Sequence, residues 1–350
     1  MVNVGLIGTG FVARLRADAL VADGRGHLVA VAGHHSAQTQ AFVAAYGARA
    51  LGSWTEVVAD PAVDLVMVCH INSGHSQVAA AALAAQKHVV VEYPLALSVA
   101  EAEALVIQAE TNQRLLHVEH IELLGGTHQA LKAHLPLVGP PFYARYATLS
   151  PKRPAPDSWT YYADRFGFPL VGALSRIHRL VDCFGAVEQV YCHNHYDGLQ
   201  PGQKGRERHR TCLCRAELRF ASGLGAEVIY GKGESIWLER RRLEVWGRDG
   251  QISLDGDQGQ LLSAEGSQSL AIGSRRGLFA EDTRRVLDHL LQGTPLYVDA
   301  RASLYSLKVA AAAQVSATTG QAVRLPDHDL TENRRIIDER QFGLPGSQPV

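Results

Sequence analysis

The chain has 350 residues, of which 46% are hydrophobic and 20% are charged, and its 34 basic and 35 acidic residues leave a formal net charge of −1. This balance excludes a disordered chain and provides no basic field for nucleic acid or an anionic membrane. Five scattered cysteines match no disulfide or zinc pattern, and no apolar run approaches a membrane span, so we expect reduced thiols, no metal site and a cytoplasmic protein.

Apolar runs and helical segments alternate over the first 120 residues. Strands separated by helices predict a parallel sheet with right-handed crossovers, and we expect a Rossmann domain over residues 1–123. Strands are expected at 2–7, 28–32, 64–69, 88–92 and 115–119, and helices at 14–22, 36–46, 54–58, 76–85 and 99–111.

A glycine-rich turn joins the first predicted strand to the first predicted helix. Gly8 permits the tight turn, Gly10 lets a pyrophosphate approach the backbone, and Ala13 keeps the helix close to the sheet. The helix N-terminus offers free N–H groups to phosphates. We therefore predict a dinucleotide site, against the alternative of a turn without a ligand. Its residues are Gly8, Thr9, Gly10, Phe11, Val12 and Ala13.

The end of the second strand carries no acidic residue of the kind that usually holds the ribose diol of NAD. Instead His34, His35 and Ser36 stand there as cofactor-binding candidates, and His35 and Ser36 can donate to a 2′-phosphate, with Arg14 or Arg16 as helpers. This pattern favours NADPH over NADH. Simple surface exposure at a strand end is the alternative for the histidines.

Five polar residues at or after the ends of the third and fourth long strands complete the predicted cofactor site. His75 is expected to cap or pack at the start of the next helix. The five are His70, Asn72, His75, Glu92 and Tyr93.

From about residue 124 the pattern changes to strands joined by turns. We expect an α+β substrate domain over residues 124–335 with a large, mostly antiparallel sheet, a mobile polar loop at 198–210 and a loosely held tail at 336–350. Strands are expected at 142–149, 189–195, 212–220, 225–230, 235–246 and 251–255, and helices at 170–184, 282–291 and 303–317.

The Rossmann pattern, Glu92-Tyr93-Pro94 after the fourth long strand and the α+β half together resemble the glucose–fructose oxidoreductase/inositol dehydrogenase (Gfo/Idh/MocA) family. Most members carry Glu-Lys-Pro, whose lysine serves acid/base chemistry, and a later helix with an Asp and a His. Here Tyr93 replaces the lysine, and Val171 and Ser175 stand at the other two positions. The departures argue against oxidation of a sugar or inositol.

Longer stretches are similar to the biliverdin reductases, and most of all to the cyanobacterial ones. The resemblance covers nearly the whole chain and is weakest over residues 191–210. It implies reduction of biliverdin IXα to bilirubin IXα with NADPH, with a hydride transferred to the C10 methine bridge and a proton to a pyrrole nitrogen. The stretches are 87–97, 115–124, 166–169, 175–176, 226–234, 273–279 and 295–299.

Arg176 is the residue for which this resemblance implies a part in catalysis, by supplying or relaying the proton or by stabilising charge on the bilin. Pairing with a propionate is the alternative. The resemblance also suggests that Arg241 binds substrate, and plain exposure to solvent is the alternative. Strand alternation sends Arg241 to the face opposite Arg240 and Arg242.

For three further residues, the sequence allows either a role in the active site or a purely structural role. Tyr93 has a phenol with a pKa of about 10 that can donate a proton, or it fills the space of the lysine. Glu122 can hold a water or a pyrrole N–H, or form a structural salt bridge, and Arg275 can face a propionate or solvent.

Three hypotheses follow for the whole chain. The first is a biliverdin reductase, the second is a sugar or polyol dehydrogenase, and the third is a non-catalytic NADP-sensing regulator. The oligomeric state is left open.

Overall fold

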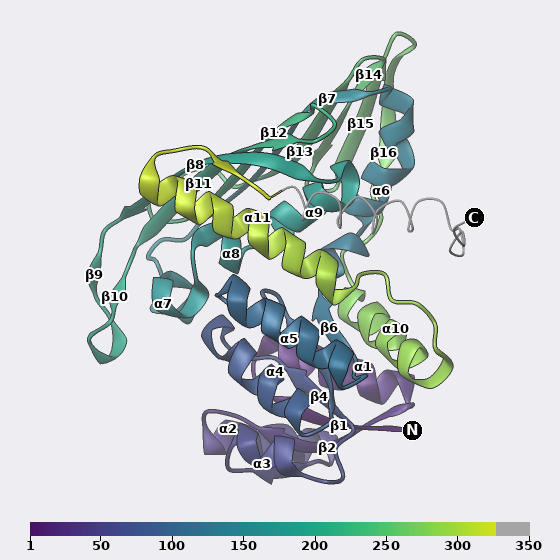
Figure 1. Ribbon diagram of the computed structural model, residues 1–350, viewed down its shortest axis with the longest axis vertical. Coiled ribbons are helices and arrows are strands. Elements are labelled where there is room, and N and C mark those ends of the chain that lie inside the picture. Colours follow the sequence, from purple (N-terminus) through teal and green to yellow (C-terminus); the bar gives the residue numbers. More distant parts are fainter. Residues whose placement is uncertain (327–350) are drawn as a thin grey trace. The chain divides into compact units, whose positions relative to one another are not determined.

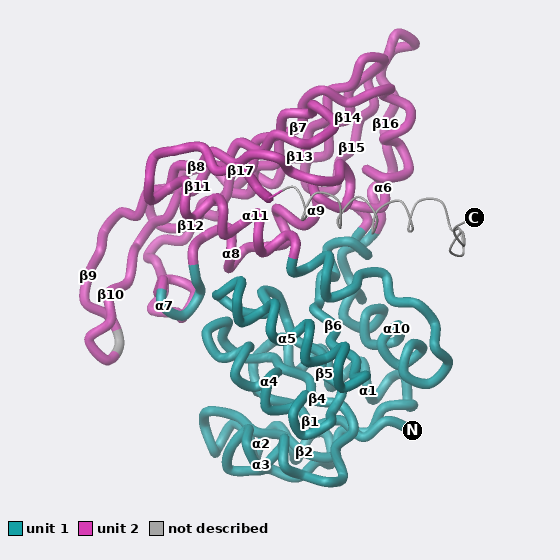
Figure 2. Tube along the Cα trace, viewed as in Figure 1, with its two compact units in different colours: residues 1–125, 164–167, 274–304 teal, residues 126–163, 168–273, 305–350 magenta. Residues whose placement is uncertain are grey.

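The computed structural model describes residues 1–326, which form two compact units (Figure 2). Unit 1 contains residues 1–125, 164–167 and 274–304, and unit 2 contains the rest. The predicted domains differ from these units, because residues 274–304 were assigned to the second domain. They belong to unit 1, where helix α10 (Leu278–Gln292) packs against helix α1 (Phe11–Asp23). The predicted tail at 336–350 lies outside the described residues.

Unit 1 is built on a six-stranded sheet in the order β3-β2-β1-β4-β5-β6, and every neighbouring pair is parallel (Figure 1). This is the doubly wound order of a dinucleotide-binding domain, so the predicted Rossmann fold is confirmed. Its strands are β1 (Val2–Ile7), β2 (Gly26–Ala32), β3 (Arg49–Leu51), β4 (Leu65–Val68), β5 (His88–Glu92) and β6 (Leu116–Glu119).

The central strands of unit 1 are apolar on both faces because helices cover both sides of a parallel sheet. Val4, Leu6, Leu65 and Met67 are fully buried there.

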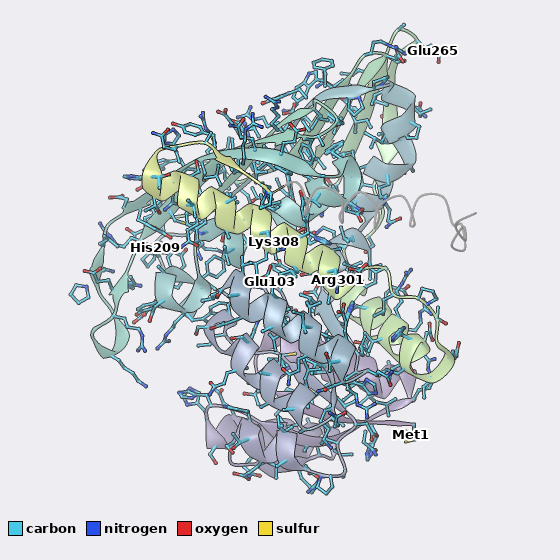
Figure 3. All side chains as sticks on the ribbon, viewed as in Figure 1. Met1, Glu103, His209, Glu265, Arg301 and Lys308 are labelled. Atoms are coloured by element: carbon cyan, nitrogen blue, oxygen red, sulfur yellow. The ribbon has the colours of Figure 1, made fainter. Side chains whose placement is uncertain are left out.

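Helix α11 (Ala300–Thr319) begins in unit 1. Near its start, Arg301, which is labelled in Figure 3, makes two 2.7 Å hydrogen bonds to Glu110. The other helices of unit 1 are α2 (Ser36–Tyr46), α3 (Trp54–Ala59), α4 (His75–Ala84) and α5 (Val99–Thr111).

Unit 2 carries a nine-stranded sheet in the order β16-β15-β14-β13-β7-β12-β11-β8-β17. Only the pair β7–β12 is parallel, which confirms the predicted mostly antiparallel sheet. Its strands are β7 (Pro141–Pro151), β8 (Val187–Asp197), β11 (Thr211–Phe220), β12 (Gly225–Gly233), β13 (Arg240–Gly247), β14 (Gly250–Asp255), β15 (Gln258–Ser263), β16 (Gly266–Ala271) and β17 (Val323–Arg324).

Helices cover one face of this sheet (Figure 1). On α11 the hydroxyl of Tyr305 accepts from Val187 N at 2.8 Å, and that of Ser316 accepts from Cys192 N at 2.9 Å. The remaining α-helices among residues 1–326 are α6 (Gly126–His134), α7 (Ala163–Phe166, most of which belongs to unit 1), α8 (Pro169–Gly172) and α9 (Ser175–Phe184). No helix in the described part of the chain is both long and apolar enough to cross a membrane.

Two predicted elements of unit 2 are wrong. The single helix predicted at 170–184 is two helices, because Ala173 leaves the helical region with a ψ of 38° between α8 and α9. The strand predicted from residue 235 begins only at Arg240. Gly233 has a φ of +122°, and Glu234 turns aside to accept a hydrogen bond from Ala155 N at 2.9 Å, so residues 234–239 form a loop.

Several weakly patterned elements were missed or misjudged. The predicted loop at 198–210 contains a small hairpin of β9 (Gln200–Pro201) and β10 (Glu207–Arg208). Strands β15 and β16 were missed because they are rich in Gly, Ser and Gln. Cys212 and Cys214 are alternate buried residues of β11, as predicted, and all five thiols are free.

Candidate active site

The glycine turn at the end of β1 leaves room for a dinucleotide. Gly8 has a φ of +118°, and a Cβ there would lie 2.2 Å from the carbonyl oxygen of Cys69, so the fold itself requires glycine. A Cβ at Gly10 would meet nothing within 4 Å. Helix α1 then starts at Phe11 with no side-chain cap and no acidic residue in its first turn. Its free N–H groups therefore fit a bound pyrophosphate.

The two glycines should separate folding from cofactor binding. We expect Gly8→Ala to destabilise the protein strongly, because the new methyl group clashes with backbone and the φ is unfavourable. Gly10→Ala should leave the melting temperature within about 2 °C but weaken NADP⁺ binding at least about tenfold, because its methyl group fills the open approach to the helix. Thermal melts and cofactor titration of both variants test this. Equal melting temperatures for the two variants would contradict it.

The end of β2 presents the predicted phosphate-binding residues to solvent. His34, His35 and Ser36 are all exposed, and Ser36 begins α2 with His35 at its N-cap. Arg14 is exposed as well and can serve as the predicted helper. Arg16 cannot, because it is fully buried, so that part of the prediction is wrong.

Arg16 is instead the centre of a buried ionic network. Its Nη2 lies 3.0 Å from Glu92 Oε1, and its Nη1 forms an ion pair with Asp282 on α10. Asp282 also accepts hydrogen bonds from the hydroxyl of Tyr297 at 2.7 Å and from His117 Nε2 at 2.8 Å. Burial alone would raise the pKa of Asp282, but Arg16 and His117 hold it below its usual range. The network fixes the Glu92 carboxylate at the end of β5.

A second carboxyl group stands beside Glu92. Glu119 is its register partner on β6 and is almost completely buried. Burial, together with the charge of Glu92, raises the pKa of Glu119 well above the ordinary value. Burial therefore favours the protonated form of Glu119, and its carboxyl group also accepts a hydrogen bond from Ile121 N.

Tyr93 follows Glu92 and is partly exposed. Its ring stacks on that of His120, with centroids 5.4 Å apart and planes 5° apart. His75 is buried behind this segment, with Nδ1 2.8 Å from the carbonyl oxygen of Pro94 and Nε2 3.0 Å from that of His70. His75 thus packs at the start of α4 and holds the backbone that carries Tyr93.

His70 and Asn72 lie at the end of β4. Burial lowers the pKa of His70 to about 4, so its ring is neutral. Its buried Nε2 has no hydrogen-bond partner among the described residues, which fits a polar group that a bound cofactor would satisfy. Asn72 is itself buried, and its Nδ2 donates to the carbonyl oxygen of Phe166 at 3.0 Å.

Arg176 lies in the first turn of α9 in unit 2, over the helix-covered face of the sheet. Its Nε donates to Thr148 Oγ1 at 3.3 Å, its Nη1 donates to Ser175 Oγ at 2.9 Å, and its guanidinium lies 5.3 Å from the ring centroid of Tyr230. Thr148 is the register partner of both Tyr230 and Arg241. Paired residues point to the same face, so the predicted orientation of Arg241 is confirmed.

Lys232 joins this group and was missed by the sequence analysis. It stands two residues after Tyr230 on β12, and alternation therefore directs it to the same face. It is buried, its Nζ donates to the carbonyl oxygen of Thr160, and it lies 4.5 Å from the ring centroid of Tyr161. Burial lowers the pKa of Lys232 to about 8. We call Arg176, Lys232, Arg241, Thr148 and Tyr230 the cationic face.

Glu122 and Arg275 were predicted to bind substrate, and both lie in unit 1. Arg275 Nη2 is 3.4 Å from Glu122 Oε1, so the two pair with each other. Arg275 is about half exposed, and such a pair contributes little to stability. Their predicted contact with substrate stays a prediction.

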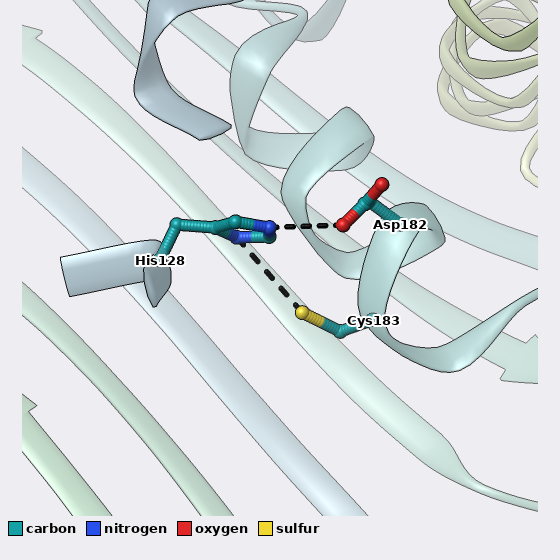
Figure 4. Close-up of side chains that lie close together, drawn as sticks. All are labelled: His128, Asp182 and Cys183. Carbon is teal, nitrogen blue, oxygen red and sulfur yellow. Dashed lines mark hydrogen bonds and ion pairs between the residues drawn. The ribbon is translucent and has the colours of Figure 1, made fainter. Parts of the chain in front are cut away.

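A cluster of potential metal ligands lies elsewhere in unit 2. His128 on α6 and Asp182 and Cys183 on α9 hold their ligand atoms within 4.8 Å of one another. Figure 4 shows the ring facing both groups, with Nε2 2.9 Å from Asp182 Oδ2 and Nδ1 3.9 Å from Cys183 Sγ. Lys132 Nζ donates to the same carboxylate oxygen at 3.0 Å. These contacts tie α6 to α9.

Two family models cover most of the chain. Residues 2–120 match "Oxidoreductase family, NAD-binding Rossmann fold", and residues 138–325 match "Oxidoreductase family, C-terminal alpha/beta domain". The chain belongs to the Gfo/Idh/MocA oxidoreductase family. It is an oxidoreductase that uses a nicotinamide dinucleotide, as the glycine turn predicts.

Among solved structures of this family, the chain is similar to biliverdin reductase from Synechocystis sp. PCC 6803 in complex with biliverdin and NADP⁺. They share 46% identity over 91% of this chain and 99% of the other, with a TM-score of 0.87. Human biliverdin reductase A is 33% identical over 39% of this chain and 44% of its own length, so the match spans less than half of the human enzyme. Myo-inositol 2-dehydrogenase from Thermotoga maritima is 24% identical over 78% of this chain and 83% of its own length.

Proposed function

We propose that this protein reduces biliverdin IXα to bilirubin IXα with NADPH, at the C10 methine bridge. The observation that carries the proposal is the 46% identity, over 91% of the chain, to a reductase whose structure holds biliverdin and NADP⁺. The cationic face adds chemical support, because a guanidinium and an ammonium suit a substrate with two propionates.

The reaction adds a hydride to C10 and a proton to a pyrrole nitrogen. When bound, NADPH supplies the hydride. Arginine is a poor direct acid because its pKa exceeds 12. We therefore assign Arg176 the task of orienting a water that gives the proton and of stabilising charge on the bilin. Thr148 and Ser175 hold its guanidinium in place through their hydroxyl groups.

Oxidation of a sugar is less well supported by the residues present. The position of the usual lysine holds Tyr93, and the usual Asp and His positions hold Val171 and Ser175, both buried. Ser175 is also engaged by Arg176. These positions hold no general base of the kind that removes a proton from a secondary alcohol.

The preference for NADPH is proposed to depend on the end of β2. Replacing His35 with Asp and Ser36 with Ala should shift the ratio of kcat/KM toward NADH by about tenfold or more, because a carboxylate there repels the 2′-phosphate and accepts from the ribose diol. Steady-state kinetics with both cofactors measure the shift. The matched control is Gln38→Ala, a nearby exposed change without charge. Unchanged selectivity in the double variant would refute the assignment.

The direct test is an absorbance assay with biliverdin and NADPH over a range of pH, with myo-inositol and NADP⁺ in parallel. Conversion of the green bilin to yellow bilirubin supports the proposal. No conversion together with inositol oxidation would favour a polyol dehydrogenase. NADPH binding without turnover of either compound would favour a regulator.

A further inference from the structure

The loop between β12 and β13, residues 234–239, presents large apolar side chains to solvent. The exposed fraction is 81% for Trp237 and 63% for Leu238. A single exposed leucine is ordinary, but a nearly bare indole beside it marks a surface that contacts something else.

The loop holds this indole in a fixed position. Ser235 donates to Asp197 Oδ2 at 3.0 Å, and its backbone N–H donates to Thr211 Oγ1 at 2.9 Å. Ile236 is buried, and its carbonyl oxygen accepts a hydrogen bond from Arg153. The loop is therefore anchored immediately before Trp237, and the exposure of the indole does not come from a loose segment.

Arg153 stacks on the indole as well. Its guanidinium carbon lies 3.8 Å from the ring centroid of Trp237, a cation–π contact that fixes the plane of the ring. Because Arg153 covers only one side and the side chain is 81% exposed, the other side is open. A rigid, open aromatic face selects a flat, conjugated ligand.

The surrounding charge narrows the class of ligand to an anion. Lys152 and Arg153 are exposed beside the loop, and Arg240 follows it. Glu234 is paired with Arg210 at 3.1 Å, which leaves two carboxylates, Glu239 and Asp197, beside these three cations, so the surface carries a net positive charge. A flat molecule with more than one carboxylate complements this surface.

The position of the loop connects it to the cationic face. It starts just after Gly233, three residues beyond Tyr230, or about 10 Å along the strand at roughly 3.3 Å per residue. It ends just before Arg240, the neighbour of Arg241. Four linked pyrrole rings extend further than the distance from Tyr230 to the start of the loop, so a bilin bound at the cationic face can extend toward the loop.

We propose that Trp237 is a stacking platform for biliverdin, held by Arg153, and that it binds part of the tetrapyrrole away from the reacting bridge. The inference rests on the proposed reductase function. It makes Trp237 a determinant of substrate affinity and gives it no part in the chemical step.

The experiment compares Trp237→Ala, Trp237→Phe and Phe142→Ala in the full chain. Phe142 is the matched control, because it is an aromatic residue with an exposed fraction of 60%. It lies at the start of β7, whereas Arg240, which follows the loop, pairs with Leu149 near the end of that strand. Steady-state kinetics give KM and kcat, and titration of the bilin absorbance in the presence of NADP⁺ gives the dissociation constant without turnover.

Trp237→Ala should raise both KM and the dissociation constant of biliverdin about 5- to 30-fold, with kcat within about twofold of the parent. Trp237→Phe, which keeps a flat ring, should stay within about threefold, and Phe142→Ala should change nothing. A dissociation constant within twofold of the parent for Trp237→Ala, or a loss of kcat with unchanged binding, would overturn the inference. If the parent protein neither binds nor reduces biliverdin, the proposed function falls with it. If the parent protein reduces biliverdin and Trp237→Ala behaves like the parent, the proposed function stands and the proposed role of Trp237 is refuted.

Discussion

Replacing Arg176 with alanine is expected to lower kcat for biliverdin reduction by about 10²- to 10⁴-fold, because the proton-donating water and the charge on the bilin lose their guanidinium. Stopped-flow absorbance of the bilin gives the rate directly. Arg176→Lys should recover only part of the rate, since an ammonium keeps the charge but not the planar fork of donors.

Arg219→Ala provides the control for removal of an arginine from the same unit. That side chain is more than half exposed and pairs only weakly, at 3.4 Å, with Glu188. It should leave kcat unchanged. If Arg176→Ala instead raises KM and preserves kcat, the guanidinium binds a propionate and the proton comes from another group.

Asp282→Ala should strongly destabilise unit 1. It removes the fully buried partner of Arg16 and leaves that guanidinium, also fully buried, with Glu92 as its one charged partner and the hydroxyl of Thr283 as a neutral one. Breaking one side of a buried pair costs about 3–5 kcal/mol of unfolding free energy. Urea denaturation, followed by circular dichroism, measures this loss.

Glu281→Gln is the control for this change, since Glu281 precedes Asp282 on α10. Its partners Arg284 and Arg285 are well exposed, and an exposed ion pair contributes about 0–1 kcal/mol. A loss of less than about 1 kcal/mol for Asp282→Ala would mean that water or a neighbouring side chain satisfies Arg16, and the network would not be structural.

The Rossmann fold of unit 1 could be predicted from the sequence because several local patterns indicate the same order of strands and helices. Apolar runs, helical segments and the glycine turn all indicate the same βαβ order, and the helix at 36–46 and the strand at 88–92 have the predicted bounds. Arg16 shows the limit of this reading. Its place on α1 is predictable, but its distant partner on α10 depends on tertiary packing.

In unit 2 the predicted strand that begins at Ser235 was wrong because the backbone conformation of a single residue outweighs the β-propensity of the residues after it. The apolar and β-prone residues from Ser235 onward favour a strand, yet the positive φ of Gly233 and the contacts of Glu234 form a loop that exposes Trp237. For Lys232, alternation with Tyr230 was the available signal. Its burial and the carbonyl oxygen of Thr160 that it binds became visible only in the fold.

The most direct test of the account follows the transferred hydrogen. Biliverdin IXα is reduced with NADPH that carries deuterium at both C4 positions, and the product is examined by mass spectrometry and NMR. We expect bilirubin IXα with one deuterium, located at the C10 bridge. Deuterium at another carbon, or bilirubin without deuterium, would contradict direct hydride transfer to C10, and the absence of bilirubin would contradict the proposed activity itself.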